Sequence, residues 1–198
     1  MSGVKIQLSL KEQEMMANTG IILTKNRVLA AVMELFGEVS EAETAYLEER
    51  RNRLPEDIFR FPPKISRGEN YLQLPWLMLD YPRVFQPAES LAVRHFFWWG
   101  NFFSVSIQVS GKYKKKLLEQ LEKWPSAAFI CVQASPWEHH FGRDNYLPLA
   151  ELDAAGIGKI AGEKNFLKLS LSLPVGQWAE APAFLLSGFT SYLDLLLD

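Results

Sequence analysis

Hydrophobic and polar side chains alternate in two stretches of the chain, and both stretches predict β-strands. In residues 103–109, apolar side chains at the odd positions alternate with serine or glutamine. In residues 166–173, four leucines alternate with Lys168, Ser170 and Ser172. A period of two places the apolar side chains on one face of a strand. This pattern is typical of an antiparallel sheet with one packed face and one polar face.

Helical spacing predicts several helices elsewhere. Ser9 and Glu12 fit a capping box, which begins a short helix that we expect to end near Gly20. Apolar residues three or four positions apart predict a second helix over residues 25–53. Further helices are expected over residues 88–95, 112–124 and 182–197.

The remaining segments complete a fold prediction. Extended chain is expected over residues 69–79, 96–109 and 127–135, with a short edge strand at 4–8 and a proline-rich connector at 54–68. The predicted class is α+β: an antiparallel sheet of about four or five strands packed by helices on one face, with a helical N-terminal segment and a doubled ββα order. We expect a single domain over residues 1–198, in which residues 1–53 pack on a core formed by 69–198.

An aromatic block at residues 95–103 reads HFFWWGNFF. Strand alternation places Phe97, Trp99 and Phe103 with the apolar side of the strand that follows. Trp98 and Phe102 then share the other side, which continues into Ser106. Three interpretations remain open for this second side: burial under the N-terminal helices, a subunit interface, or the wall of a ligand pocket.

Composition removes several classes of function. The net charge of −2 gives no general attraction to nucleic acid, so a nucleic-acid partner is not expected. No apolar run reaches the roughly 18–20 residues that span a bilayer, and no signal segment is evident. We therefore expect a cytoplasmic protein without membrane association. Cys131 is the only cysteine, which excludes an intrachain disulfide.

Enzyme-like residues gather in one segment. Glu138, His139, His140 and Asp144 are ligand and acid–base residue types. Adjacent histidines on extended chain point to opposite sides, and the helical i, i+4 spacing of a zinc site is absent. Because the residue types favour a metal-assisted hydrolase centred on these residues while their spacing does not, we keep it as the alternative hypothesis. The glycine-rich segment 156–162 lacks the Ser or Thr that follows the lysine of a phosphate-binding loop, and we expect no cofactor.

Three segments carry a resemblance to a known group of proteins. They are ISRGENY at 65–71, LDYPR at 79–83 and FWWGNFF at 97–103. They resemble uncharacterised proteins of Bacteroidetes-type bacteria, and LTKN at 23–26 and LFGE at 35–38 extend the resemblance over most of the chain. No activity is attached to that family. The resemblance implies a bacterial, cytoplasmic setting and no functional residue.

The surplus of aromatic side chains, beside no complete catalytic constellation, favours a binding or protein-interaction module over an enzyme. Its predicted surface is the sheet face with Trp98, Phe102 and Ser106. Tyr81 and Arg83 lie in a predicted turn at 79–83, which is either a purely structural turn or one that displays both side chains at the rim of a pocket. The expected partner is a small apolar or aromatic ligand or a protein, including a second copy in a homodimer.

Overall fold

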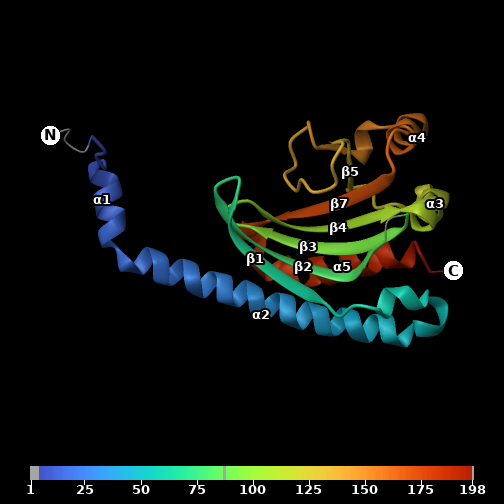
Figure 1. The fold of residues 1–198 in the computed structure, drawn as a ribbon, viewed down its shortest axis with the longest axis horizontal. Helices are drawn as coiled ribbons and strands as arrows, with labels where there is room; N and C mark the ends of the chain where they lie inside the picture. Colours follow the sequence, from blue (N-terminus) through green and yellow to red (C-terminus); the bar gives the residue numbers. More distant parts are fainter. Residues whose placement is uncertain (1–4, 87, 198) are drawn as a thin grey trace.

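Seven antiparallel strands form the centre of the structure, a computed structural model that describes residues 5–86 and 88–197 (Figure 1). The strands are β1 (Lys64–Tyr71), β2 (Leu74–Phe85), β3 (Ser90–Trp98), β4 (Phe102–Ser110), β5 (Phe129–Cys131), β6 (Tyr146–Pro148) and β7 (Phe166–Pro174). Their order across the sheet is β1-β2-β3-β4-β7-β5-β6. The α-helices are α1 (Leu10–Ala17), α2 (Thr19–Glu49), α3 (Gly111–Glu119), α4 (Ala154–Gly162) and α5 (Ala181–Asp194).

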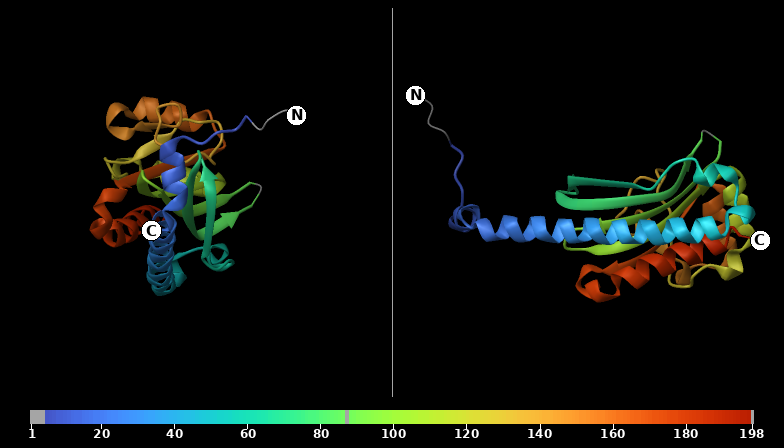
Figure 2. Two further views of the ribbon diagram at one scale, coloured as in Figure 1. Left: turned by 90° about the vertical axis from the view of Figure 1, so that its left-hand side faces the viewer. Right: turned by 90° about the horizontal axis from the view of Figure 1, so that it is seen from below.

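Helices α2 and α5 cover one face of the sheet, which we call the helix face (Figures 1 and 2). The odd-numbered apolar residues of β4 and β7 point to it, and Val105, Ile107 and Leu169 are fully buried. Gly188 of α5 lies directly on Val105, where a Cβ atom would come within 3.0 Å of the valine side chain. The α+β class, the antiparallel sheet and the helical N-terminal segment are thereby confirmed.

The expected number of four or five strands is wrong, because the segments predicted as single strands at 69–79 and 96–109 each contain parts of two strands, and β6 had no prediction. Residues 64–68, expected to be a connector, begin β1, which pairs with β2 across a turn at Leu72 and Gln73. The three-residue strand β6 is too short to show a period. Four strands therefore precede α3, and the doubled ββα order is also wrong.

The helix predicted over residues 88–95 is wrong, because residues 90–95 form the first part of strand β3. Ser90–Phe97 are buried on both faces of the sheet, so this segment has no alternation of polar and apolar positions to mark it as a strand. Residues 96–109 are not one strand, since Trp99, Gly100 and Asn101 form a turn between β3 and β4. The Asn101 amide donates to the Trp98 carbonyl oxygen (3.0 Å), and Gly100, at the third position of this turn, has φ of +72°, the left-handed conformation that a type II turn requires there.

The N-terminal end of the chain projects from the body of the protein (Figure 2). Ser9 and Glu12 form the predicted capping box, which begins α1. Every residue from 5 to 24 is exposed, and we call this segment the N-terminal arm. Residues 5–8 form no strand, and Val4 of the predicted edge strand lies outside the described residues. No helix within the described residues is long and apolar enough to cross a membrane.

The contact between α5 and β4 generates a prediction for two glycines that both lie inside helices. At Gly37 of α2 an added Cβ meets nothing within 4 Å, so Gly37→Ala should stabilise the protein by about 1 kcal/mol through helix propensity alone. Gly188→Ala should destabilise it, because overpacking against the buried Val105 costs about 1–3 kcal/mol. Urea unfolding of the two variants checks this. Equal stabilisation by both would contradict the packing of α5 on β4.

Candidate functional site

The sheet face turned away from α2 and α5, which we call the second face, changes character along its strands. Residues that are paired on neighbouring strands form rows of side chains across this face. The rows are Trp76–Trp98–Phe102–Pro174, Met78–Phe96–Ser104–Ser172, Asp80–Arg94–Ser106–Ser170 and Phe85–Ser90–Ser110–Phe166. The face is thus aromatic at the end near the β3–β4 turn, charged in the middle, and polar with small side chains at the far end.

A loop covers the aromatic end. Residues 132–145, between β5 and β6, lie over the second face, and we call them the covering loop. The Tyr71 hydroxyl accepts hydrogen bonds from the backbone amides of His139 (2.8 Å) and His140 (3.1 Å) and donates one to Glu138 (3.1 Å). The His139 ring stacks on Phe96 with centroids 4.6 Å apart. One tyrosine therefore holds three successive residues of the loop on the sheet.

Trp98 and Phe102 lie at the edge of this covered region, and both are half-buried. The Trp98 indole donates to the carbonyl oxygen of Tyr71 (3.1 Å), and Phe102 makes an edge contact with Phe141 (4.9 Å between centroids). Helix α2 lies on the opposite face of the sheet and α1 projects from the body, so the interpretation that the N-terminal helices bury these two rings is wrong. The binding-wall interpretation of these two rings stays a prediction.

The other predicted binding residues separate, and the predicted turn at 79–83 is wrong because these residues lie within β2. Ser106 lies on the second face and bonds Ser170 (2.7 Å). Arg83 donates to the carbonyl oxygen of Pro62 (2.8 Å) and lies over the Phe61 ring. Tyr81 is buried, 4% exposed, beside Thr44 of α2, which places it on the helix face. The structure therefore does not bring Tyr81 together with Trp98 and Phe102.

The charged middle of the second face holds three buried charged side chains. Arg94 and Asp80 form an ion pair of 2.6 Å. Lys168, which is 1% exposed, donates to the carbonyl oxygens of Pro136 (2.8 Å) and Glu138 (2.7 Å) in the covering loop. Burial lowers the pKa of Lys168 to about 7. Lys168 is thus a second anchor of the loop, and its charge is costly to keep there.

The residues of the metal hypothesis do not converge. Glu138 bonds Tyr71, the His139 ring lies against Phe96, and His140 lies 4.0 Å from Asp144. His95 is on the helix face, bonded to Glu43. Within the described part of the chain, no three His, Cys, Asp or Glu side chains are grouped so that they could hold a metal ion. This geometry gives the hydrolase alternative no support.

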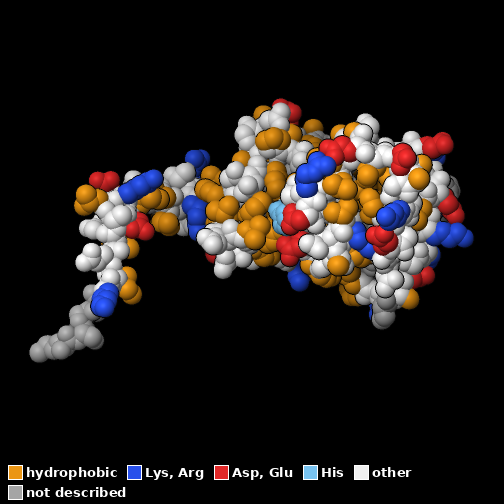
Figure 3. All heavy atoms as spheres, turned by 90° about the horizontal axis from the view of Figure 1, so that it is seen from above, with side chains coloured by type: hydrophobic (Ala, Val, Ile, Leu, Met, Phe, Trp, Pro, Cys, Tyr) orange, Lys and Arg blue, Asp and Glu red, His pale blue; other side chains and the backbone are white. Residues whose placement is uncertain are grey.

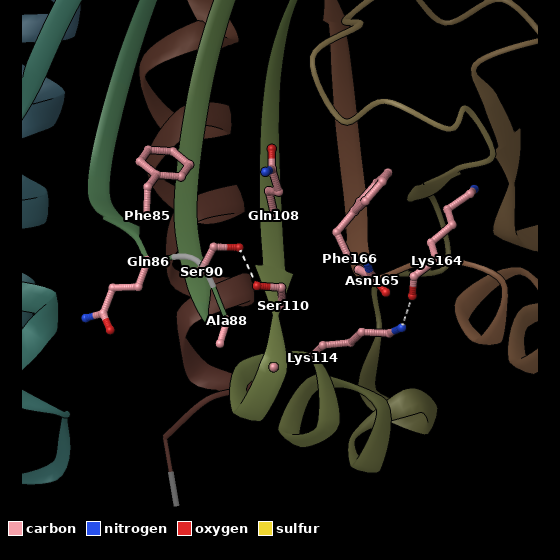
Figure 4. A pocket seen from close by; sticks show the side chains of 11 residues that line it. Phe85, Gln86, Ala88, Ser90, Gln108, Ser110, Lys114, Lys164, Asn165 and Phe166 are labelled. Atoms are coloured by element: carbon pink, nitrogen blue, oxygen red, sulfur yellow. Dashed lines mark hydrogen bonds between the residues drawn. The ribbon is translucent and has the colours of Figure 1, made fainter.

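The polar end of the second face holds a pocket of 830 Å³ that the sequence patterns did not indicate (Figure 4). Its lining includes Phe85, Ser90, Gln108, Ser110, Lys114 and Phe166. Phe85 and Phe166 stand on either side of a floor of smaller side chains. The available signal was Ser90 together with the serines at even positions of β4, because small side chains on a sheet leave space above it.

Comparisons with models of protein families, with curated proteins and with solved structures give no match for this chain. The resemblance to proteins of Bacteroidetes-type bacteria therefore stays a prediction.

The anchoring of the covering loop predicts the effect of one hydroxyl. Tyr71→Phe leaves two backbone amides without their acceptor, and each lost partner of a buried polar group costs about 1–3 kcal/mol. We expect faster amide hydrogen exchange at residues 139–140 with the sheet unchanged. Tyr113→Phe, which removes a hydroxyl bonded to Asp57 elsewhere, is the control. Unchanged exchange in the loop of Tyr71→Phe would show that Tyr71 is not its anchor.

Burial of His139 predicts a dependence on acid. Burial, together with the charges of Lys168 and Arg94, lowers the pKa of His139 to about 2. The unfolded chain takes up this proton below about pH 6.5 and the folded chain does not. The free energy of unfolding should therefore fall as the pH falls from 6.5 toward 4, by up to about 1.4 kcal/mol per pH unit from this residue. His139→Phe keeps the ring contact with Phe96 and should remove this contribution to the pH dependence of the free energy of unfolding. The measurement is urea unfolding of both proteins at several pH values. The same pH dependence in the wild type and the variant would contradict the prediction.

Proposed function

We propose that the protein is an interaction module that self-associates through its N-terminal arm. The observation that carries this proposal is the exposure of large apolar side chains along the arm (Figure 3). They are Ile6, Leu8, Leu10, Met15, Met16, Ile21, Ile22 and Leu23. Apolar surface gathered in this way is typical of interaction sites.

The arm has no packing of its own to hold it in place. Helix α1 has eight residues and none of them is buried. Isolated helices shorter than about 12–15 residues are marginal in water, and most helical stability comes from packing. A surface that covers the arm would supply this packing.

The body of the same chain offers a surface of matching chemistry. Beside the point where α2 joins the sheet there is an apolar hollow of 330 Å³. It is lined by Val28, Phe97, Trp99, Gly100, Phe103, Val175 and Trp178. Trp178 is 43% exposed there. Tryptophan is enriched in protein interfaces, so an exposed tryptophan beside the hollow is consistent with a contact surface.

A second copy is the occupant that these features favour. Each copy carries one arm and one apolar hollow, so a two-fold dimer satisfies both pairs by mutual exchange. Residues 5–24 and the lining of the hollow together have the size of one side of a standard interface, roughly 20–30 residues. Lys5 and Lys11 are balanced by Glu12 and Glu14, so the arm has no net positive charge to draw it to an anionic lipid surface.

The proposal predicts the outcome for three variants in sedimentation experiments on the full chain. The wild type should be a dimer. Joint replacement of Ile22 and Leu23 by aspartate, at side chains 55% and 66% exposed, should give a folded monomer, because it places two charges in an apolar contact. Trp178→Ala should weaken dimerisation at least about tenfold. Leu72→Asp, equally exposed at 56% in the β1–β2 turn, should leave the dimer unchanged.

Mixing the two defective proteins separates arm exchange from other modes of assembly. The arm variant retains an intact hollow, and the Trp178→Ala variant retains an intact arm, so their mixture should form a heterodimer with one intact contact. A dimer that is insensitive to Trp178→Ala would mean that the arms pair with each other. A monomeric wild type, or a monomer that binds lipid vesicles through the arm, would reject the proposal.

A further inference from the structure

The pocket at the polar end of the second face has a regular construction. Its row Phe85–Ser90–Ser110–Phe166 crosses four adjacent strands, and Ser90 and Ser110 are joined by a hydrogen bond of 2.9 Å. Three strand spacings place the two phenylalanine positions about 14 Å apart. The two serines between them are small, so the space above the floor stays open (Figure 4).

Gln108 is the polar group that the floor leaves without a partner. Its side chain is 7% exposed, and the hydrogen bonds of the described residues include none from its amide. Neither polar atom of this amide is among the fully buried, unpartnered side-chain atoms of the described residues, so the amide is open to the pocket. Because Gln108 lines the pocket, a bound molecule can supply that partner.

The lysine ammonium groups at the β7 side of the pocket donate hydrogen bonds to backbone carbonyl oxygens, which are neutral groups. Lys114 donates to the carbonyl oxygens of Ala161 (2.6 Å) and Lys164 (2.5 Å), and Lys164 donates to that of Cys131 (2.8 Å). Lys168 is paired with Gln108 in the register but is not part of the pocket lining, and it donates to two carbonyl oxygens of the covering loop. Among the described residues, none of these three lysines forms an ion pair.

Glu163 acts on Lys164 and Glu138 acts on Lys168 through their negative charge, but neither forms an ion pair with these lysines among the described residues. Glu89, at the α3 end of the pocket, is paired with Lys112 at 2.9 Å, and Asp80 is paired with Arg94. Burial lowers the pKa values of Lys114, Lys164 and Lys168. An anion that enters the pocket would offset this cost of burial, since opposite charge stabilises the ammonium form.

We propose that this pocket binds a small organic anion. Its anionic group lies at the Lys114 and Lys164 end, and its apolar body lies over Gln108 between Phe85 and Phe166. The volume of 830 Å³ falls in the range of about 300–1,000 Å³ that is usual for small-molecule sites. This inference is independent of the N-terminal arm, which lies at the other end of the sheet.

The proposal is tested by calorimetric titration of the full chain with four probes. Phenyl phosphate and benzoate carry an anionic group and a ring, benzamide carries only the ring, and inorganic phosphate only the anion. We expect both ring-bearing anions to bind at least about tenfold more tightly than benzamide or inorganic phosphate. Equal affinity of phenyl phosphate and inorganic phosphate would overturn the role of the phenylalanines. Failure of both ring-bearing anions to bind by about 10 mM would overturn the site.

Variants locate the binding. Lys114→Met should weaken benzoate at least about tenfold, and the exposed Phe85→Ala, which breaks no hydrogen bond, should weaken it while inorganic phosphate binding is unchanged. Lys115→Met, on the exposed side of the same helix, is the control and should bind as the wild type does. Should Lys114→Met unfold, Phe85→Ala still decides the matter. Equal affinity of Phe85→Ala and the wild type for benzoate would reject the proposal.

Discussion

The constraint on which this structure depends is that its central strands are buried on both faces. This holds for nearly all of β3 and β4 and for residues 167–170 of β7, which have α2 and α5 on one side and no such pair of helices on the other. The helix face is covered with ordinary apolar packing, because α2 and α5 each supply an apolar side. The second face has no helix of this kind. Its cover is the 132–145 loop, which is held by Tyr71 and Lys168 and reaches only part of the face.

Because a loop and not a helix covers the second face, polar side chains can be buried beneath it. Lys168, Arg94, Asp80, Ser106 and Ser170 are each less than about a tenth exposed, although they lie on the polar side of strands. A loop has backbone carbonyls to offer in place of apolar side chains, and a lysine ammonium can donate to them. Buried polar networks of this kind are stable only when each member has its partners. Gln108 lies just beyond the loop and lines the pocket, and within the described residues its side chain has no hydrogen-bond partner.

The sequence revealed the helix face better than the second face, and the reason is periodicity. The expectation that Phe97 and Phe103 share the packed side is confirmed, even though the turn between them went unrecognised. A turn that pairs Trp98 with Phe102 preserves odd and even positions, so the alternation continues through it unchanged. Residues 90–97 gave no such signal, because burial on both faces removes the alternation that marks a strand. The covering loop could not be placed either, since contacts such as Tyr71 with His139 join residues far apart in the chain and follow from no local pattern.

The two proposed sites lie at opposite ends of the same strands. The apolar hollow includes Trp99 and Gly100 of the β3–β4 turn, whereas the polar pocket includes Ser90 and Ser110, where β3 begins and β4 ends. Strands of nine residues separate these ends by about 30 Å. Charge at one end is largely screened from the other over this distance, since the Debye length at physiological salt is about 8 Å. Coupling between assembly and ligand binding would therefore have to pass through the packing of β3 and β4, and the rigid, doubly buried core of these strands makes them poorly suited to change shape. The chain is thus better understood as a sheet that separates two independent surfaces than as one site with a single function.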